Sequence, residues 1–357
     1  MERLHPKIRK MNDESGTVLS LYQSTPHDGS DPGAHAIRFK NLIRKAEEEL
    51  SNNLDRKALQ EQMDVLHDLQ SDTVFWNDRS EAFALFLRDG KRLLIYNLSE
   101  PVDDMVVVQD ILHLLPLLSA EQHISAHYIL DISRDRFNLY RGDGAKYSEV
   151  TDHGALSFDE LYDDLDSNAD VNFGSYAGKG GTAFHGHRSS PDMKEKDQEK
   201  YYRYLSENLT PYFVKKGLPV ILSGVSENMS VWHATTSNDI YLKEDLGKPF
   251  HDFDAQSLKA AVLNIFENIQ NEKLQRGMES LAKGLADGKA STQLDEIKKA
   301  AEECKIETLY IRCDYRDEER QDFDQLVRDC FQMGGSVVMV PVTVREMDKR
   351  IAARFRY

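Results

Sequence analysis

The chain has 357 residues, of which 45 are Lys or Arg and 61 are Asp or Glu, so its formal net charge is −16 at pH 7. Hydrophobic residues make up 40% and charged residues 30%, which is typical of a globular protein and excludes a mainly disordered, collagen-like or coiled-coil chain. At roughly 100–200 residues per domain, this length predicts two or three domains.

Membrane, secretory and metal-binding classes have little support in the sequence. No apolar run approaches the roughly 18 residues that span a bilayer, and the basic, polar first residues lack the apolar stretch of a secretory signal. We therefore expect a cytoplasmic protein with no membrane partner. Cys304, Cys313 and Cys330 form neither a C-x-x-C pair nor a disulfide framework. No metal site and no cofactor are expected. Because the chain is acidic, any RNA contact must use local Lys and Arg residues, and we expect no DNA partner.

The first region begins with a predicted strand at 17–22, where branched and aromatic residues alternate with polar ones. A loop rich in Pro, Asp and Gly follows, and then a polar-faced helix. That helix is predicted from one apolar stripe, formed by Phe39, Leu42, Ile43, Ala46 and Leu50. A second helix near 59–69 precedes two paired strands around a turn at Arg88–Gly90. We assign residues 1–123 to an N-terminal α/β domain.

The second region opens with a β-hairpin pattern at 127–144, with its turn at Ser133–Asp135. A Gly-rich loop at 174–191 comes next. A helix follows, with a face formed by Tyr201, Leu205, Leu209 and Tyr212. This helix should end at Gly217, because Gly suits the position after a helix and Pro219 cannot continue it. A buried strand then leads to the end of a middle domain, assigned to 124–255.

The third region, 256–357, alternates helices with strands. A long helix is predicted from about 258, because its apolar residues keep helical spacing, and a short helix at 294–304 comes next. A strand at 307–312, a helix ending at Gly334–Gly335, a strand at 336–341 and a closing strand in RFRY complete the chain. The predicted fold class is α/β (α+β), built from several layers.

The most unusual stretch is VNFGSYAGKGGTAFHGHRSSP, residues 171–191. It contains no acidic residue, although 61 of the 357 residues are Asp or Glu, and it holds Lys179, Arg188, two histidines and five glycines. Glycines let a backbone approach a phosphate closely, so the composition favours a contact with a polyanion. An ordinary surface loop is the alternative. A nucleotide-binding P-loop is poorly matched, because only three residues separate Gly174 from Gly178, and Gly180 replaces the Ser or Thr that binds magnesium.

Two sets of residues raise the alternative of a metal-dependent nuclease or phosphatase. His185 and His187 form an H-x-H pattern, but the neighbouring Gly, Ser and Pro residues disfavour the rigid strand that would align two imidazoles. Asp131, Asp135 and Asp143 resemble a magnesium-binding carboxylate cluster. Two of these three lie in predicted turns, where Asp commonly bonds to the local backbone. We rank this alternative below RNA binding.

Basic residues on the first helix form a second candidate RNA contact. Arg38, Lys40 and Arg44, with Lys45 beside them, could meet RNA from one surface of that helix. A solvated face is an equally good interpretation, because Lys45 and Glu49 are an i, i+4 pair. The last residues, 345–357, have a net charge of +3, for which a solvated terminal edge is the default interpretation.

The order of these features resembles the archaeal and eukaryotic class-1 peptide-chain release factors and Pelota, and is most similar to the bacterial archaeo-eukaryotic release factor families. TVLSLYQSTP followed by IRFKNLIRKAEEEL is similar to the opening strand and helix of those proteins. HYILDISRDRFNLYRG resembles the hairpin that opens their middle domain, and GKGGT stands where they have a Gly-Gly-Gln loop. AAEECKIETLYIRCD, QMGGSVVMVPV and RFRY resemble their C-terminal domain. The resemblance implies an RNase H-like middle domain and an L7Ae-like C-terminal domain.

The resemblance also implies a factor that binds rRNA and tRNA in the ribosomal A site, with a translational GTPase as a candidate further partner. In the release factors, the backbone N–H of the loop Gln stabilises the charge that develops during ester hydrolysis. Gly180, Gly181 and Thr182 occupy the corresponding positions here, so Thr replaces Gln. Lys179, His185, His187 and Arg188 are the expected RNA-binding residues of the loop. AHAIRFKN does not contain the Asn-Ile-Lys-Ser stop-codon element. Ribosome rescue, hibernation or related quality control is therefore the expected function, with peptidyl-tRNA hydrolysis as the enzymatic alternative.

Overall fold

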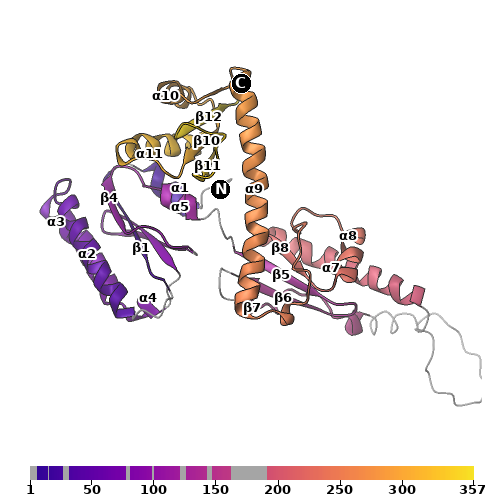
Figure 1. The fold of residues 1–357 in the computed structure, drawn as a ribbon. Helices are drawn as coiled ribbons and strands as arrows, with labels where there is room; N and C mark the ends of the chain where they lie inside the picture. The colour runs from indigo at the N-terminus through magenta and orange to yellow at the C-terminus, as the bar shows by residue number, and fades with distance from the viewer. Residues whose placement is uncertain are drawn as a thin grey trace, which may run out of the picture. The chain divides into compact units, whose positions relative to one another are not determined.

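The computed structural model describes residues 6–14, 16–26, 32–77, 81–98, 100–120, 126–142, 147–161 and 191–357 (Figure 1). They form two compact units. Unit 1 comprises Met1–Ile124 with Glu267–Tyr357, and unit 2 comprises Ser125–Phe266. The described residues form a mixed α/β fold with three four-stranded sheets, which confirms the predicted fold class. In this part of the chain, no helix combines the length and the apolar character needed to cross a membrane.

The first sheet of unit 1 has the strand order β3-β2-β1-β4, with antiparallel neighbours throughout. Its strands are β1 (Val18–Ser24), β2 (Ala82–Arg88), β3 (Arg92–Leu98) and β4 (Met105–Gln109). The predicted turn between β2 and β3 is confirmed, because Arg88 pairs with Arg92 and both Asp89 and Gly90 have positive φ angles. All seven residues of β2 are buried, so both faces of this sheet are covered.

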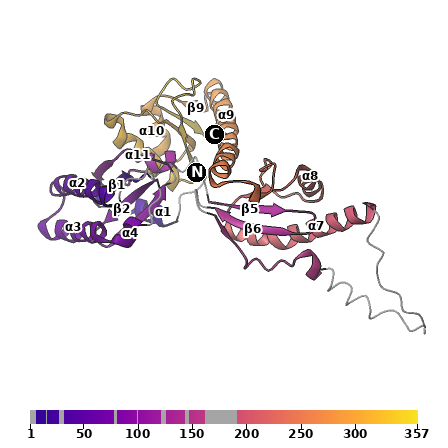
Figure 2. The ribbon, with the colours of Figure 1, turned by 60° about the horizontal axis from the view of Figure 1, so that its bottom comes forward.

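Helices cover one face of this sheet. They are α2 (Pro32–Leu50), α3 (Arg56–Ser71) and α4 (Thr73–Asn77). The apolar stripe predicted on α2 is buried against Leu19, Leu21 and the odd-numbered residues of β2. Figures 1 and 2 both show α2 and α3 side by side over this sheet. The other face packs into a cluster that includes α1 (Pro6–Asp13), α5 (Leu115–Ala120) and residues near the end of the chain.

The last part of unit 1 contains the second sheet, with the strand order β11-β10-β12-β9. Its elements are α9 (Ala255–Ala286), which begins in unit 2, β9 (Ala290–Ser291), α10 (Leu294–Glu302), β10 (Ile306–Arg312), α11 (Asp317–Gln332), β11 (Ser336–Val340) and β12 (Ile351–Phe355). The helix α11 connects the parallel strands β10 and β11, and β12 pairs antiparallel with β10. The predicted alternation of helices and strands is therefore confirmed for this region.

Unit 2 is built on a sheet with the strand order β7-β6-β5-β8. Its elements are β5 (His127–Ile132), β6 (Phe137–Gly142), β7 (Tyr147–Glu149), α7 (Pro191–Lys216), β8 (Val220–Ser223), α8 (Ser226–Thr235) and the short 3-10 helix η2 (Phe250–Asp252). The hairpin β5–β6 and the buried strand β8 confirm the sequence predictions. Gly217 ends α7 with a φ of +68°, a backbone conformation that favours Gly.

Candidate RNA-binding site

The Gly-rich segment belongs to unit 2 and is bracketed by residues that the structure describes. The residues predicted on it all lie outside the described residues: Lys179, Gly180, Gly181, Thr182, His185, His187 and Arg188. The described residues before the segment end at Leu161, and those after it begin with α7. The structure therefore bears on this segment through its two flanks.

The flank before the segment is attached to α7. The backbone N–H of Leu156 donates to the Tyr204 hydroxyl over 3.0 Å, and the rings of Phe158 and Tyr201 meet edge to face with centroids 5.2 Å apart. The Glu160 carboxylate accepts from the Ser157 hydroxyl at 2.7 Å and from its backbone N–H at 2.8 Å. These bonds lower the pKa of Glu160. Residues 156–160 are therefore attached to α7.

The flank after the segment is fixed by a buried chain of polar contacts. The Gln198 amide donates to the Tyr202 hydroxyl and to the Asn228 side chain, each over 2.9 Å. The Tyr202 hydroxyl donates to the backbone carbonyl of Ser133 over 3.0 Å, at the turn between β5 and β6. Burial raises the pKa of Tyr202 to about 12, so this hydroxyl keeps its proton at neutral pH. Both flanks are thus held by the core of unit 2.

The basic side chains of α2 differ in whether they form an ion pair. Arg38 forms an ion pair with Asp104, with Nη2 and Oδ2 2.7 Å apart. The other oxygen of Asp104 accepts the backbone N–H of Ser24 over 3.0 Å, so Arg38 helps to join α2 to the end of β1. Lys40 and Arg44 are exposed, and neither forms an ion pair with a described residue. Of the three cations predicted here, Lys40 and Arg44 are therefore available to an RNA phosphate.

The carboxylates of the nuclease alternative are not brought together in the described part of the chain. Asp131 Oδ1 accepts the backbone N–H of Phe250 over 3.0 Å, which attaches η2 to the sheet. Asp135 lies exposed in the β5–β6 turn, 3.6 Å from Arg136, and Asp143 falls outside the described residues. Among the described residues, no three His, Cys, Asp or Glu side chains are grouped as metal ligands. Asp131 has a structural role in this arrangement.

Two features of these surfaces were missed in the sequence. Asp104 lies 66 residues from Arg38, and no local pattern connects them. Gln198 lies one helical turn before Tyr202, on the face already marked by Tyr201 and Leu205. That i, i+4 spacing was the available signal for a polar residue on the buried face of α7.

Unit 2 thus combines a mixed sheet, the β5–β6 hairpin and the long helix α7, which follows the Gly-rich segment. The model of the bacterial archaeo-eukaryotic release factor family 8 matches residues 124–274, which include all of unit 2 and the first part of α9. Over this part of the chain, the match confirms the resemblance to the bacterial archaeo-eukaryotic release factor families that the sequence motifs indicate.

Several solved structures are similar to this chain. The archaeal translation termination factor aRF1 is 16% identical, with a TM-score of 0.23, over 98% of this chain and 95% of that chain. Pelota from Archaeoglobus fulgidus is 15% identical, with a TM-score of 0.31, over 77% and 79%. Dom34 from S. cerevisiae, a translation termination-like factor, is 12% identical, with a TM-score of 0.42, over 78% and 86%. No curated protein has a matching sequence.

Proposed function

We propose that this protein is a translation factor of the release factor and Pelota type that binds rRNA and tRNA in the ribosomal A site, in ribosome rescue, hibernation or termination-like quality control. The observation that carries the proposal is the family match over 124–274, since it contains the acid-free segment 171–191. The contacts of residues 156–160 and of Gln198 and Tyr202 support it, because they attach the described chain on both sides of the segment to unit 2.

The proposal includes a division of the chain into three domains. They comprise residues 1–123, 124–255 and 256–357, with an RNase H-like middle domain and an L7Ae-like C-terminal domain. It places the protein in the cytoplasm, with a translational GTPase as a candidate partner. Support for these finer points comes from the sequence motifs alone.

The electrostatic part of the proposal assigns RNA contacts to two local groups of cations. A chain with a net charge of −16 repels RNA as a whole, so binding depends on places where acids are absent or cations are exposed. Lys179 and Arg188 lie in the acid-free segment, while Lys40 and Arg44 are exposed on α2. The two groups can be tested separately.

Ribosome co-sedimentation across a salt series tests the segment. In the variant Lys179→Glu with Arg188→Glu, we expect weaker binding and a log–log salt slope reduced by about 1.5, because two phosphate contacts no longer release counterions. The matched control is Lys273→Glu with Lys283→Glu, two exposed residues of α9 with the same change in charge. If the segment variant and the control bind alike, the segment has no part in RNA binding.

Peptidyl-tRNA hydrolysis is the second candidate function, and the adjacent Gly180 and Gly181 favour it. In that mechanism, the backbone N–H of Thr182 would donate to the oxyanion of the ester. Thr has no side-chain amide to position the attacking water, so we expect little peptide release by the wild type and a gain in Thr182→Gln. Rapid release by the wild type would instead make this chain a hydrolase without the loop Gln.

A further inference from the structure

A fully buried His–Asp pair joins two parts of unit 1 that are far apart in sequence. His113 lies between β4 and α5, and Asp324 lies on α11, 211 residues later. The side chains of both are completely buried, and His113 Nδ1 is 2.9 Å from each carboxylate oxygen of Asp324. The pair therefore connects the N-terminal part of unit 1 (residues 6–120) to its C-terminal part (residues 267–357).

Each side of the pair is held by further hydrogen bonds. Gln109, the last residue of β4, donates to Asp324 Oδ2 over 2.8 Å. The backbone N–H of His113 donates to the Ser20 hydroxyl over 3.1 Å, and the Tyr315 hydroxyl lies 3.4 Å from Nε2. The N-terminal part thus holds the backbone of His113, while both ring nitrogens face groups of the C-terminal part, Asp324 and Tyr315.

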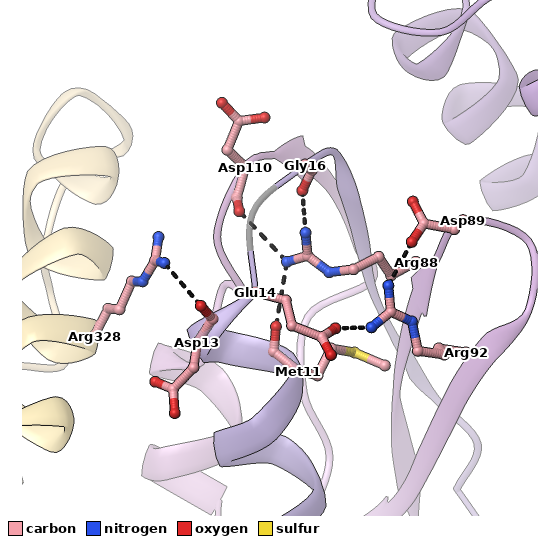
Figure 3. A network of polar contacts seen from close by, with 9 residues as sticks. All are labelled: Met11, Asp13, Glu14, Gly16, Arg88, Asp89, Arg92, Asp110 and Arg328. Carbon is pink, nitrogen blue, oxygen red and sulfur yellow. Dashed lines mark hydrogen bonds and ion pairs between the residues drawn. The ribbon is translucent and has the colours of Figure 1, made fainter.

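A second contact between the same parts lies at the edge of the interface. Arg328 and Gln332 of α11 donate to Asp13 of α1, over 3.5 Å to its backbone carbonyl and 3.1 Å to its side chain. Figure 3 shows Arg328 and Asp13 facing each other from the two parts. Both hydrogen bonds are exposed to water, where such contacts contribute little. The polar contacts described at the buried centre are therefore those of Asp324 with His113 and Gln109.

Each part also has a hydrophobic core that excludes the other. One cluster lies entirely between residues 19 and 87, where α2, α3 and α4 cover the first sheet. Another lies between 278 and 352, where α9 packs on the second sheet. A third cluster combines residues of both parts and surrounds the interface. Two bodies with separate cores can dock and separate, and a polar pair at their interface is rehydrated on separation.

We propose that the His113–Asp324 pair is a latch that keeps the N-terminal and C-terminal parts of unit 1 docked, and that breaking it separates the two parts while each keeps its core. An apolar interface alone tolerates shifts in register, whereas this pair is satisfied in one arrangement. The latch makes the exposed cations of α2 and the C-terminal sheet move as one body. It does not depend on the proposed function.

The chain offers a direct probe of docking. The Ser119 hydroxyl on α5 lies 3.6 Å from the Cys313 thiol, across the same interface. In Ser119→Cys, diamide should remove the two thiol hydrogens and join the introduced sulfur to Cys313 when the parts are docked. Cys304→Ser in the same chain removes the other exposed thiol. The rate of disulfide formation, followed by non-reducing peptide mapping, reports the docked fraction.

In this background, we expect Asp324→Ala to slow disulfide formation about tenfold or more, because it leaves His113 and Gln109 without their buried acceptor. Asp324→Asn keeps an acceptor for His113 and should slow it by less than about threefold. The matched control is Asp322→Ala on the same helix, where an exposed ion pair with Lys298 is lost and the rate should stay within about twofold.

A second measurement separates undocking from loss of folding. The Cys330 thiol is fully buried and donates over 3.3 Å to the backbone carbonyl of Ser336, which also lies in the C-terminal part. The latch predicts that Cys330 stays protected from alkylation in Asp324→Ala while disulfide formation slows. An unchanged rate of disulfide formation would overturn the latch. Slow formation together with exposure of Cys330 would also overturn it, because the pair would then serve the folding of the C-terminal part.

Discussion

Arg88 is a buried cation whose removal should destabilise unit 1 more than removal of its exposed neighbour Arg92. Its side chain is fully buried at the end of β2, and burial lowers its pKa. Figure 3 shows its guanidinium among three backbone carbonyls, which accept from it. Those of Met11 and Asp110 lie 3.3 and 3.4 Å from Nη2, and that of Gly16 accepts from Nη1. Arg88 thus joins α1, the chain before β1 and the end of β4.

The substitution Arg88→Met keeps the apolar stem and removes every donor. A buried acceptor left unpaired costs about 1–3 kcal/mol, and the two longer bonds count for less than the bond to Gly16. The substitution also removes the cost of burying a charge, which offsets part of this loss. We expect a net loss of about 2 kcal/mol in the free energy of unfolding, which is roughly a 30-fold change in the folding equilibrium constant.

The assay is urea unfolding followed by the fluorescence of Trp76, which is buried in unit 1, in a Trp232→Phe background. The matched control is Arg92→Met. Arg92 pairs with Glu14 and Asp89 in the same network, but its side chain is 44% exposed, so we expect a loss below about 1 kcal/mol. If Arg92→Met costs as much as Arg88→Met, the argument from burial is wrong.

Three further predictions concern other buried groups. Burial raises the pKa of Cys330 to about 12. We therefore expect no reaction of Cys330 with a disulfide reagent at pH 8 in the folded protein, while exposed Cys304 reacts. Rapid labelling of Cys330 would contradict this. Burial lowers the pKa of His153 below its value in the unfolded chain, so the fold favours the neutral imidazole. The contribution of His153 to the stability of unit 2 should therefore be complete above the unfolded pKa and decline as the pH falls below that value. Urea midpoints read from Trp232 at pH 7.5 and 5.5 should show a smaller decline in His153→Gln. Gly142→Ala should cost about 1–3 kcal/mol in the same assay, because the new Cβ would lie 2.6 Å from the ring of Tyr147; a midpoint equal to the wild type would contradict that packing.

Local patterns in the sequence predict most of the long elements. The stripe from Phe39 to Leu50 identifies α2, and the glycine after α7 marks its end, because both features depend on residues a few positions apart. Short elements were missed: α1, α4, β4, α5, β7, α8, η2 and β9. They have few residues over which a period can be recognised, and packing in the folded chain decides their structure.

Contacts between distant residues account for what the sequence did not reveal. Arg38 and Lys40 look alike as cations on one helix, yet only Arg38 meets Asp104 in the described structure. His113 and Asp324 have no pattern in common, and their pairing depends on how the two parts of unit 1 dock. The composition of the Gly-rich segment remains the basis for its predicted role, since its residues lie outside those the structure describes.

The central claim is binding in the ribosomal A site. Its most direct test is co-sedimentation of the purified protein with ribosomes whose A site is empty, repeated at the same low salt with a tRNA in that site. The account predicts binding to the empty ribosome and its loss when the tRNA is present. Binding that the tRNA leaves unchanged, or no binding in either case, would contradict it.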